Sequence, residues 1–253
     1  KPTGNVLLAS LPIMISAKTG SVRVTKTVTG ETAGYTGGAV FPVTLTCDTG
    51  VQGTRDVAGG DSVTFDGIPV GSTCSASEGA AHGGLLDGSY AWGEPTIGDA
   101  VKLTDPGTAD IAISNPVSRV YAGIEVAKII DDGGFAGVAD PGQRFSGEWS
   151  CRYRSEDPVS GTWSSSGSAA GTVATLTGDA GHVLVGSECS VTEDTSFGAP
   201  SDDPSYRWDA TPSFHGVTVE AGEPNRLTVS NPLRRAPGRV TVAKELAGET
   251  GGY

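Results

Sequence analysis

The sequence repeats itself at the length of a whole domain, and this repeat limits the fold more than any other feature. A short segment ending in lysine occurs three times, at 21–26, 123–128 and 238–244. Three further motifs occur twice each: Gly-Ser-x-Cys followed by Glu at 71–78 and 186–193, Ser-Tyr-x-Trp at 89–92 and 205–208, and Ser-Asn-Pro at 114–116 and 230–232. The copies lie about 100–115 residues apart, which is the size of an independent domain and exceeds a solenoid repeat.

The repeat predicts two complete modules and the start of a third. We expect the first module at 19–118, the second at 119–235, and the first strand of a further, incomplete module at 236–253. Residues 1–18 form an N-terminal segment, for which the tail of a preceding module is one interpretation. Short links that contain Pro join the modules, and such links behave as stiff spacers. We therefore expect the natural protein to continue with further modules of the same kind.

Apolar and polar residues alternate with a period of two within each module, as in Phe41–Cys47 and Leu227–Val229. Clusters of Gly, Pro, Asp and Asn separate these runs, and the chain contains 38 Gly and 15 Pro residues, too many for a helical protein. No segment spaces its apolar residues as a helix would. The chain is therefore predicted to be all-β, built from tandem antiparallel β-sandwich modules of the immunoglobulin-like kind.

The charge of the chain argues against two classes of partner. The net charge is −12, and the longest run of basic residues is Arg234–Arg235. We therefore expect no nucleic-acid binding and no docking on an anionic membrane. No apolar run is long enough to span a bilayer, so we also expect no membrane insertion.

Catalytic and metal-binding residues are sparse. The three histidines, His82, His182 and His215, occupy unmatched positions and are expected at the surface. The carboxylate pairs Asp131–Asp132 and Asp202–Asp203 lie outside any calcium-loop motif and fit solvated turns. No Cys-x-x-Cys pair occurs, which argues against zinc. We expect no metal, no cofactor and no enzymatic activity in the ordinary sense.

The chain has four cysteines, an even number that favours disulfides and an extracellular location. The alternative is a cytosolic protein with four free thiols. Because the cysteines follow the same order in each copy, we predict one disulfide inside each module. The predicted pairs are Cys47–Cys74 and Cys151–Cys189.

Each module carries three polar residues along otherwise apolar strand faces. Residues i, i+2 and i+4 of a strand share one face, so Val22, Val24 and Lys26 point into the core together. The same reasoning applies to Lys128 and Lys244, to Asn115 and Asn231, and to Glu78 and Glu193. A buried charge must be paired or neutral, so we predict that one Lys, one Glu and one Asn meet in each complete module. The alternative is that each strand end reaches the surface, where the lysine stays in water and the asparagine begins a turn.

Taken in order, these motifs resemble the Cna-B-type sandwich modules of Gram-positive surface adhesins and pilins, and more closely the Cys-containing repeat modules of actinobacterial cell-surface proteins. In the Cna-B-type family a first-strand Lys and a last-strand Asn form a spontaneous isopeptide bond, promoted by a Glu from the facing sheet. The implied crosslinks are Lys26–Asn115 promoted by Glu78 and Lys128–Asn231 promoted by Glu193. The family's usual Glu-x-x-Ala-Pro-x-Gly-Tyr stretch is absent here. Trp92 and Trp208, at matching positions, either shield these residues from water or simply pack in the core.

Two functions fit the sequence. The preferred one is a structural stalk or fibre segment at a bacterial cell surface or cell wall, whose partners are further modules of the same protein and neighbouring copies that pair through the strand 239–244. The alternative is an adhesin region that binds a host or environmental ligand through its loops. Such a site needs exposed aromatic residues that the modules do not share, and the candidates are Trp149, Trp163 and Tyr153.

Overall fold

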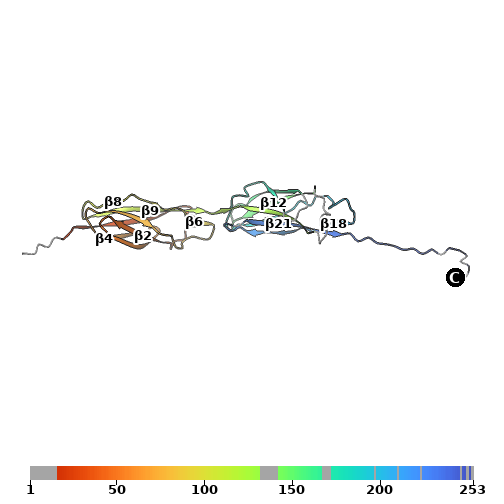
Figure 1. Cartoon of the computed structure of the whole chain (residues 1–253), viewed down its shortest axis with the longest axis horizontal. Coiled ribbons are helices and arrows are strands. Elements are labelled where there is room, and N and C mark those ends of the chain that lie inside the picture. The colour runs from red at the N-terminus through yellow and green to blue at the C-terminus, as the bar shows by residue number, and fades with distance from the viewer. Residues whose placement is uncertain are drawn as a thin grey trace, which may run out of the picture. The chain divides into compact units, whose positions relative to one another are not determined.

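The structure, a computed structural model, describes residues 16–131, 142–166, 172–196, 198–209, 211–222, 224–245, 247–248 and 251. The chain forms two compact units, unit 1 (Lys1–Arg119) and unit 2 (Val120–Tyr253) (Figure 1). Apart from one short 3-10 turn, η1 (Thr32–Gly34), the regular structure of the described residues consists of strands. The prediction of an all-β chain with two tandem domains is confirmed.

Unit 1 is a sandwich of two sheets. The first sheet contains, in spatial order, β4 (Ser62–Pro69), β1 (Thr19–Gly30), β9 (Thr108–Arg119) and β6 (Tyr90–Trp92), with β7 (Thr96–Ile97) also paired to β9. The second contains β3 (Gln52–Ala58), β2 (Val40–Cys47), β5 (Thr73–Glu78) and β8 (Val101–Lys102). Alternate residues of both sheets, such as Val24 and Leu45, point inward and form one apolar core.

Unit 2 repeats this architecture. Its first sheet contains β14 (Thr172–Val173), β11 (Ile124–Asp131), β21 (Asn225–Arg235) and β18 (Tyr206–Trp208), with β19 (Ser213–His215) also paired to β21. Its second contains β15 (Thr175–Leu176), β13 (Val159–Ser166), β12 (Arg144–Arg152), β17 (Glu188–Val191) and β20 (Val217–Thr218). A short ribbon joins β10 (Tyr121–Ala122) to β16 (Val183–Leu184). Val126 and Val229 belong to the single core between the two larger sheets.

The first and last long strands of each unit are parallel neighbours, which corrects the purely antiparallel prediction. β1 pairs in parallel with β9, and β11 pairs in parallel with β21, whereas the other pairs between described strands are antiparallel. Alternation in a sequence reveals which face of a strand is buried but not which way a neighbouring strand runs. When a chain enters a sandwich at one end and leaves it at the other, its first and last strands point the same way.

The repeated Gly-Ser-x-Cys motif forms the same turn in both units. Gly71 and Gly186 have φ angles of 99° and 86°, a region that glycine adopts far more readily than other residues. The serines that follow, Ser72 and Ser187, are buried. Each turn leads into the strand that carries a cysteine, β5 in unit 1 and β17 in unit 2.

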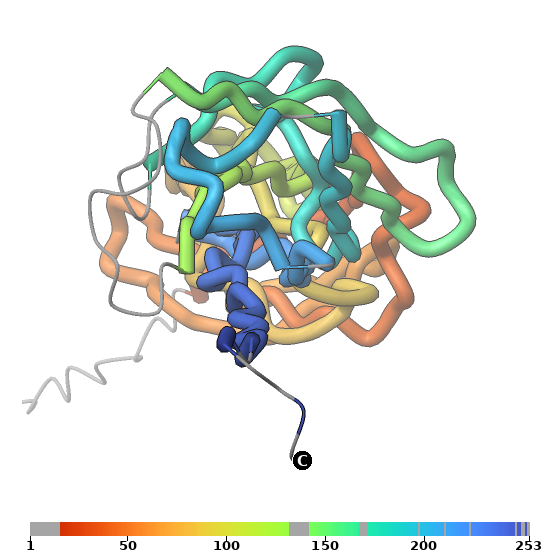
Figure 2. The backbone as a smooth tube through the Cα atoms, turned by 90° about the vertical axis from the view of Figure 1, so that its right-hand side faces the viewer, coloured from red at the N-terminus to blue at the C-terminus, as the bar shows by residue number. Residues whose placement is uncertain are grey.

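The third copy of the opening motif does not form a strand in the single chain. Residues 236–245 lie outside the described strands, and Val240 and Val242 are each 87% exposed. Figure 2 shows this dark-blue tail leading away from the compact part of unit 2. In the single chain residues 239–244 pair with no described strand and Lys244 is exposed rather than turned inward, while pairing of this segment with a neighbouring copy stays a prediction. Most of the N-terminal segment 1–18 lies outside the described residues. In the part of the chain that the structure describes, no helix is long and apolar enough to cross a membrane.

Candidate functional site

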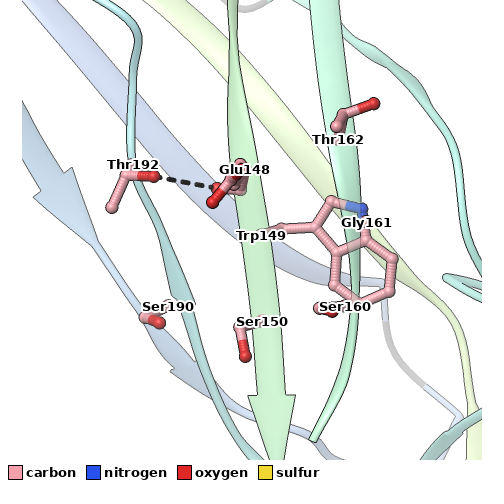
Figure 3. A pocket seen from close by; sticks show the side chains of 8 residues that line it. All are labelled: Glu148, Trp149, Ser150, Ser160, Gly161, Thr162, Ser190 and Thr192. Atoms are coloured by element: carbon pink, nitrogen blue, oxygen red, sulfur yellow. Dashed lines mark hydrogen bonds between the residues drawn. The ribbon is translucent and has the colours of Figure 1, made fainter.

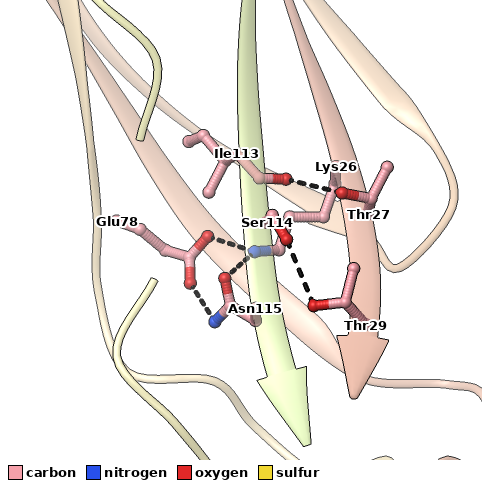
Figure 4. Close-up of polar contacts among 7 residues, drawn as sticks. All are labelled: Lys26, Thr27, Thr29, Glu78, Ile113, Ser114 and Asn115. Atoms are coloured by element: carbon pink, nitrogen blue, oxygen red, sulfur yellow. Dashed lines mark hydrogen bonds and ion pairs between the residues drawn. The ribbon is translucent and has the colours of Figure 1, made fainter. Parts of the chain in front are cut away.

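Lys26, Glu78 and Asn115 meet in the core of unit 1 (Figure 4). The Lys26 side chain is fully buried, and its amine lies 2.7 Å from Glu78 Oε2. The same amine donates a hydrogen bond to Asn115 Oδ1, and Asn115 Nδ2 donates one of 2.7 Å to Glu78 Oε1. Each of the three side chains therefore contacts the other two.

The parallel pairing of β1 and β9 brings the lysine and the asparagine together. Lys26 is the register partner of Ile113, and Asn115 lies two residues further along β9 on the same face. Glu78 comes from the facing sheet, at the last position of β5. Two neighbouring strands thus supply the amine and the carboxamide, and the opposite layer supplies the carboxyl group.

Unit 2 builds the equivalent cluster with one difference. Lys128 is the register partner of Val229, and Asn231 again lies two residues further on. Lys128 Nζ forms an ion pair of 3.1 Å with Glu193 Oε1, and both side chains are almost fully buried. The buried carboxamide of Asn231 has no hydrogen-bond partner among the described residues. The amine and the carboxyl group are thus in contact, and Asn231 lies close enough to Glu193 to lower the pKa of that carboxyl group.

Burial alters the protonation of these groups. It lowers the pKa of Lys26 against the opposing effect of Glu78, and it lowers the pKa of Lys128 to about 8 against the opposing effect of Glu193. Burial likewise raises the pKa of Glu193, a change that the ion pair with Lys128 only partly offsets. Burial therefore shifts both amines toward the neutral form, which is the form that attacks a carboxamide, and in unit 2 it shifts the carboxyl group toward the protonated form.

A phenylalanine covers each lysine amine, and the sequence analysis did not identify these two residues. The amine of Lys26 lies 4.1 Å from the ring centroid of Phe41, and that of Lys128 lies 4.3 Å from the ring centroid of Phe145. The signal was present, because each phenylalanine stands six residues before the first cysteine of its module.

The repeated tryptophans form a second layer outside the phenylalanines. Trp92 packs edge-on against Phe41 with ring centroids 5.1 Å apart, and Trp208 packs against Phe145 at 5.8 Å. Both tryptophans are only half-buried. They therefore pack against the rings that cover the amines. Of the two alternatives for these tryptophans, shielding from water and core packing, each residue has a part in both.

The structure contains the two predicted disulfides, Cys47–Cys74 and Cys151–Cys189. Each joins directly opposed residues of two neighbouring antiparallel strands, β2 and β5 in unit 1 and β12 and β17 in unit 2. No free cysteine occurs among the described residues. The disulfides lie in the sheet opposite to the one that carries the lysine and the asparagine.

The aromatic residues proposed for an adhesin site are part of the core. Trp149 and Trp163 are each 1% exposed and Tyr153 is 6% exposed, so the prediction that they form a binding surface is wrong. The indole nitrogens of Trp149 and Trp163 donate hydrogen bonds to backbone carbonyls, at 3.1 Å to Thr177 and 2.8 Å to Thr192. The shallow hollow over this part of unit 2 is lined mainly by serine and threonine hydroxyls with Glu148 (Figure 3).

The remaining sequence candidates lie apart from the buried clusters. His82, His182 and His215 are exposed. Asp203 accepts a hydrogen bond of 2.9 Å from the backbone of Ser205, as expected for a turn, and Asp132 lies outside the described residues. Within the described part of the chain, no group of three or more His, Cys, Asp or Glu side chains could hold a metal ion.

The family follows from a match that covers both units. Residues 22–118 and 124–233 each match the family model described as Domain of unknown function (DUF5979). The chain belongs to the DUF5979 family. Each matched segment begins in the strand that carries the lysine, β1 or β11, and ends two or three residues after the asparagine. Each segment therefore contains one complete Lys, Glu and Asn cluster. No curated protein matches the chain.

Several solved structures are similar to this DUF5979 chain. One is the Bacillus anthracis TIE protein, with 14% sequence identity and a TM-score of 0.43, over 85% of this chain and 34% of that chain. Another is a Mobiluncus mulieris adhesin that contains intramolecular disulfide, isopeptide and ester bond crosslinks, with 23% identity and a TM-score of 0.27, over 40% of this chain and 42% of that chain. A single B repeat unit of the collagen-binding surface protein of Staphylococcus aureus is also similar, with 14% identity and a TM-score of 0.25, over 85% of this chain and 98% of that chain. The chain thus spans less than half of the first two proteins. Because all three TM-scores lie below 0.5, function must be inferred from this chain's own residues.

Proposed function

We propose that each unit forms an intramolecular isopeptide bond, Lys26–Asn115 in unit 1 and Lys128–Asn231 in unit 2, and that the chain is a load-bearing stalk or fibre segment at a bacterial cell surface. The observation that carries this proposal is the mutual contact of Lys26, Glu78 and Asn115 in the core of unit 1. No stabilising role requires such a costly buried set of polar groups, since an apolar core of the same volume would serve as well.

The reaction balances without an oxidant or a cofactor. The neutral amine of Lys26 attacks Cγ of Asn115, a new C–N bond forms, and the bond from Cγ to Nδ2 breaks. Glu78 accepts a proton from the attacking amine and passes it to the departing nitrogen, which leaves as ammonia. The fold holds the reacting groups together, so an intramolecular step replaces an enzyme. Each unit reacts once.

Ammonia released in unit 1 would leave through a surface hollow. A surface hollow beside the end of β5 is lined in part by Glu78, Asn115 and Trp92. We take this hollow as the exit because it borders the carboxamide, whereas Phe41 covers the amine.

The crosslink would change how the unit carries tension. Because β1 and β9 are parallel, the chain enters through the start of β1 and leaves through the end of β9. A Lys26–Asn115 bond would pass the force directly between these strands, and residues 27–114 would lie outside the loaded path. Disulfides inside each unit fit an extracellular setting for such a segment.

Intact-mass measurement of the reduced protein tests the proposal. Loss of one ammonia per unit predicts a deficit of about 34 Da relative to the sequence, from the stoichiometry of amine attack on a carboxamide. Peptide mapping should recover Lys26 linked to Asn115 and Lys128 linked to Asn231. A reduced protein with the mass of its sequence would show that the lysines are unreacted and would overturn the proposal.

A further inference from the structure

In each unit the disulfide and the glutamate belong to the same strand segment. Cys74 opens the β2–β5 ladder opposite Cys47, and Glu78 closes it opposite Val43. The two residues are four apart and therefore on the same face of β5. In unit 2, Cys189 lies on β17 opposite Cys151, and Glu193 follows two residues after that strand ends.

The half of the strand that carries the glutamate has support on one side only. β8 pairs with Thr73 and Cys74 at the start of β5. From Ser75 to Glu78, the described strand pairings of β5 involve β2 alone. β20 likewise pairs only with Glu188 and Cys189 at the start of β17. The backbone around each glutamate is thus aligned by pairing with one neighbouring strand, β2 for Glu78 and β12 for Glu193.

A shifted register of β5 on β2 would misplace the glutamate. A slip of one residue moves every side chain of a strand to the opposite face. Such a slip would carry Glu78 out of the core and into water, where a carboxylate is better solvated. A covalent bond between directly opposed residues of the same pair excludes the slip, and Cys47–Cys74 is such a bond.

We propose that the disulfides are positioning elements for the isopeptide reaction: Cys47–Cys74 places Glu78, Cys151–Cys189 places Glu193, and the crosslink of a unit forms at its full rate only after its disulfide has closed. This inference rests on the proposed function. Two thiols lose two electrons and two protons to an external disulfide oxidant, which is reduced to two thiols. The amide-forming step that follows consumes no oxidant. The order of the two bonds links crosslinking to export into an oxidising environment.

The two units allow a test with an internal control. The full chain is synthesised in a cell-free system containing glutathione disulfide, and ammonia loss is followed over time by intact mass and by mapping of linked peptides. In the Cys47→Ala/Cys74→Ala variant we expect crosslinking of unit 1 to slow roughly 10- to 100-fold, the effect of modest misplacement of a reacting group. Unit 2 of the same molecules should react at its normal rate. The Cys151→Ala/Cys189→Ala variant should show the reverse.

Two further variants separate positioning from general stability. Ile68→Ala removes a buried side chain at the end of β1 remote from Lys26, where Ile68 pairs with Gly20. At a temperature that gives it the same folded fraction as the cysteine variant, it should crosslink at the wild-type rate. Glu78→Gln should slow crosslinking strongly in the oxidised chain but only slightly in the cysteine variant, because there the glutamate is already misplaced.

The outcomes are distinct. Wild-type rates in the cysteine variant, or an equal loss in Ile68→Ala, would overturn the positioning role while leaving the isopeptide bonds intact. An oxidised wild-type chain that loses no ammonia would overturn the proposed function and this inference with it.

Discussion

Asn115 lies opposite Val28 in the parallel β1–β9 pair, two residues beyond the register partner of Lys26. Unit 2 shows the same offset, with Asn231 opposite Ile130 and Lys128 opposite Val229. On one face of a sheet, a long lysine side chain spans this diagonal separation and a shorter one cannot. The offset therefore explains why one of the two reacting side chains must be as long as lysine.

Replacing one glutamate should abolish one crosslink. Glu78→Ala removes the group that transfers the proton in unit 1, so the mass of the reduced protein should rise by about 17 Da beyond the change in the side chain. Glu193→Ala should give the same rise through unit 2. Each variant has the other unit as its control, and loss of both crosslinks from a single substitution would contradict independent reaction in the two units.

The phenylalanine that covers Lys26 should affect the rate of crosslinking by more than the loss of its buried volume explains. Phe41→Ala and Phe65→Ala each remove a buried ring from unit 1, and such changes cost about 3–5 kcal/mol. Only Phe41 contacts the amine, and its loss admits water that stabilises the charged form of the lysine. Phe41→Ala should therefore slow crosslinking well beyond the matched variant Phe65→Ala. Equal rates in linked-peptide mapping would assign Phe41 to packing alone.

The Lys128 amine should make the uncrosslinked unit 2 more stable as the pH rises. Its pKa is lowered from 10.5 to about 8 in the folded state, so between these values the unfolded chain binds more protons than the folded one. The free energy of unfolding of unit 2 then increases with pH, by about 3 kcal/mol at most. Thermal unfolding of the Asn231→Ala variant between pH 8 and pH 10 should show this rise. Adding Lys128→Met should remove it, and a persisting rise would point to another group.

The sequence was informative wherever a strand alternates strictly. The i, i+2, i+4 rule placed Lys26 and Lys128 with the apolar residues, and both are buried. The matched order of the cysteines gave the disulfide pairs that the structure contains. These features depend on one strand or on a repeat, and both can be read along the chain.

Features that depend on a partner strand could not be read in this way. The valines of the third copy alternate as those of β1 do, yet Val240 and Val242 are exposed because burial requires a facing sheet as well as a pattern. Trp149 and Trp163 occur in one module only, which suggested a binding surface, but a second module can fill its core with different residues. The contact of Phe41 with Lys26 joins the two facing sheets. The matched spacing of each phenylalanine before its cysteine marks the residue but does not reveal which side chain it contacts.

Stretching a single molecule should reveal which residues carry the load. Lys26 and Asn115 are 89 residues apart in sequence, and the disulfide closes a separation of 27 residues within that segment. With the crosslink formed, residues 27–114 cannot be extended, so the release of unit 1 should add almost no length. In Glu78→Ala, unfolding of unit 1 should release about 200 Å of chain with the disulfide closed and about 300 Å after reduction, at roughly 3.5 Å per residue. Force spectroscopy at constant pulling speed resolves these lengths, with unit 2 as the unchanged reference. A wild-type chain in which unit 1 extends as far as in Glu78→Ala would show that tension passes through the whole sandwich and that no covalent path joins β1 to β9.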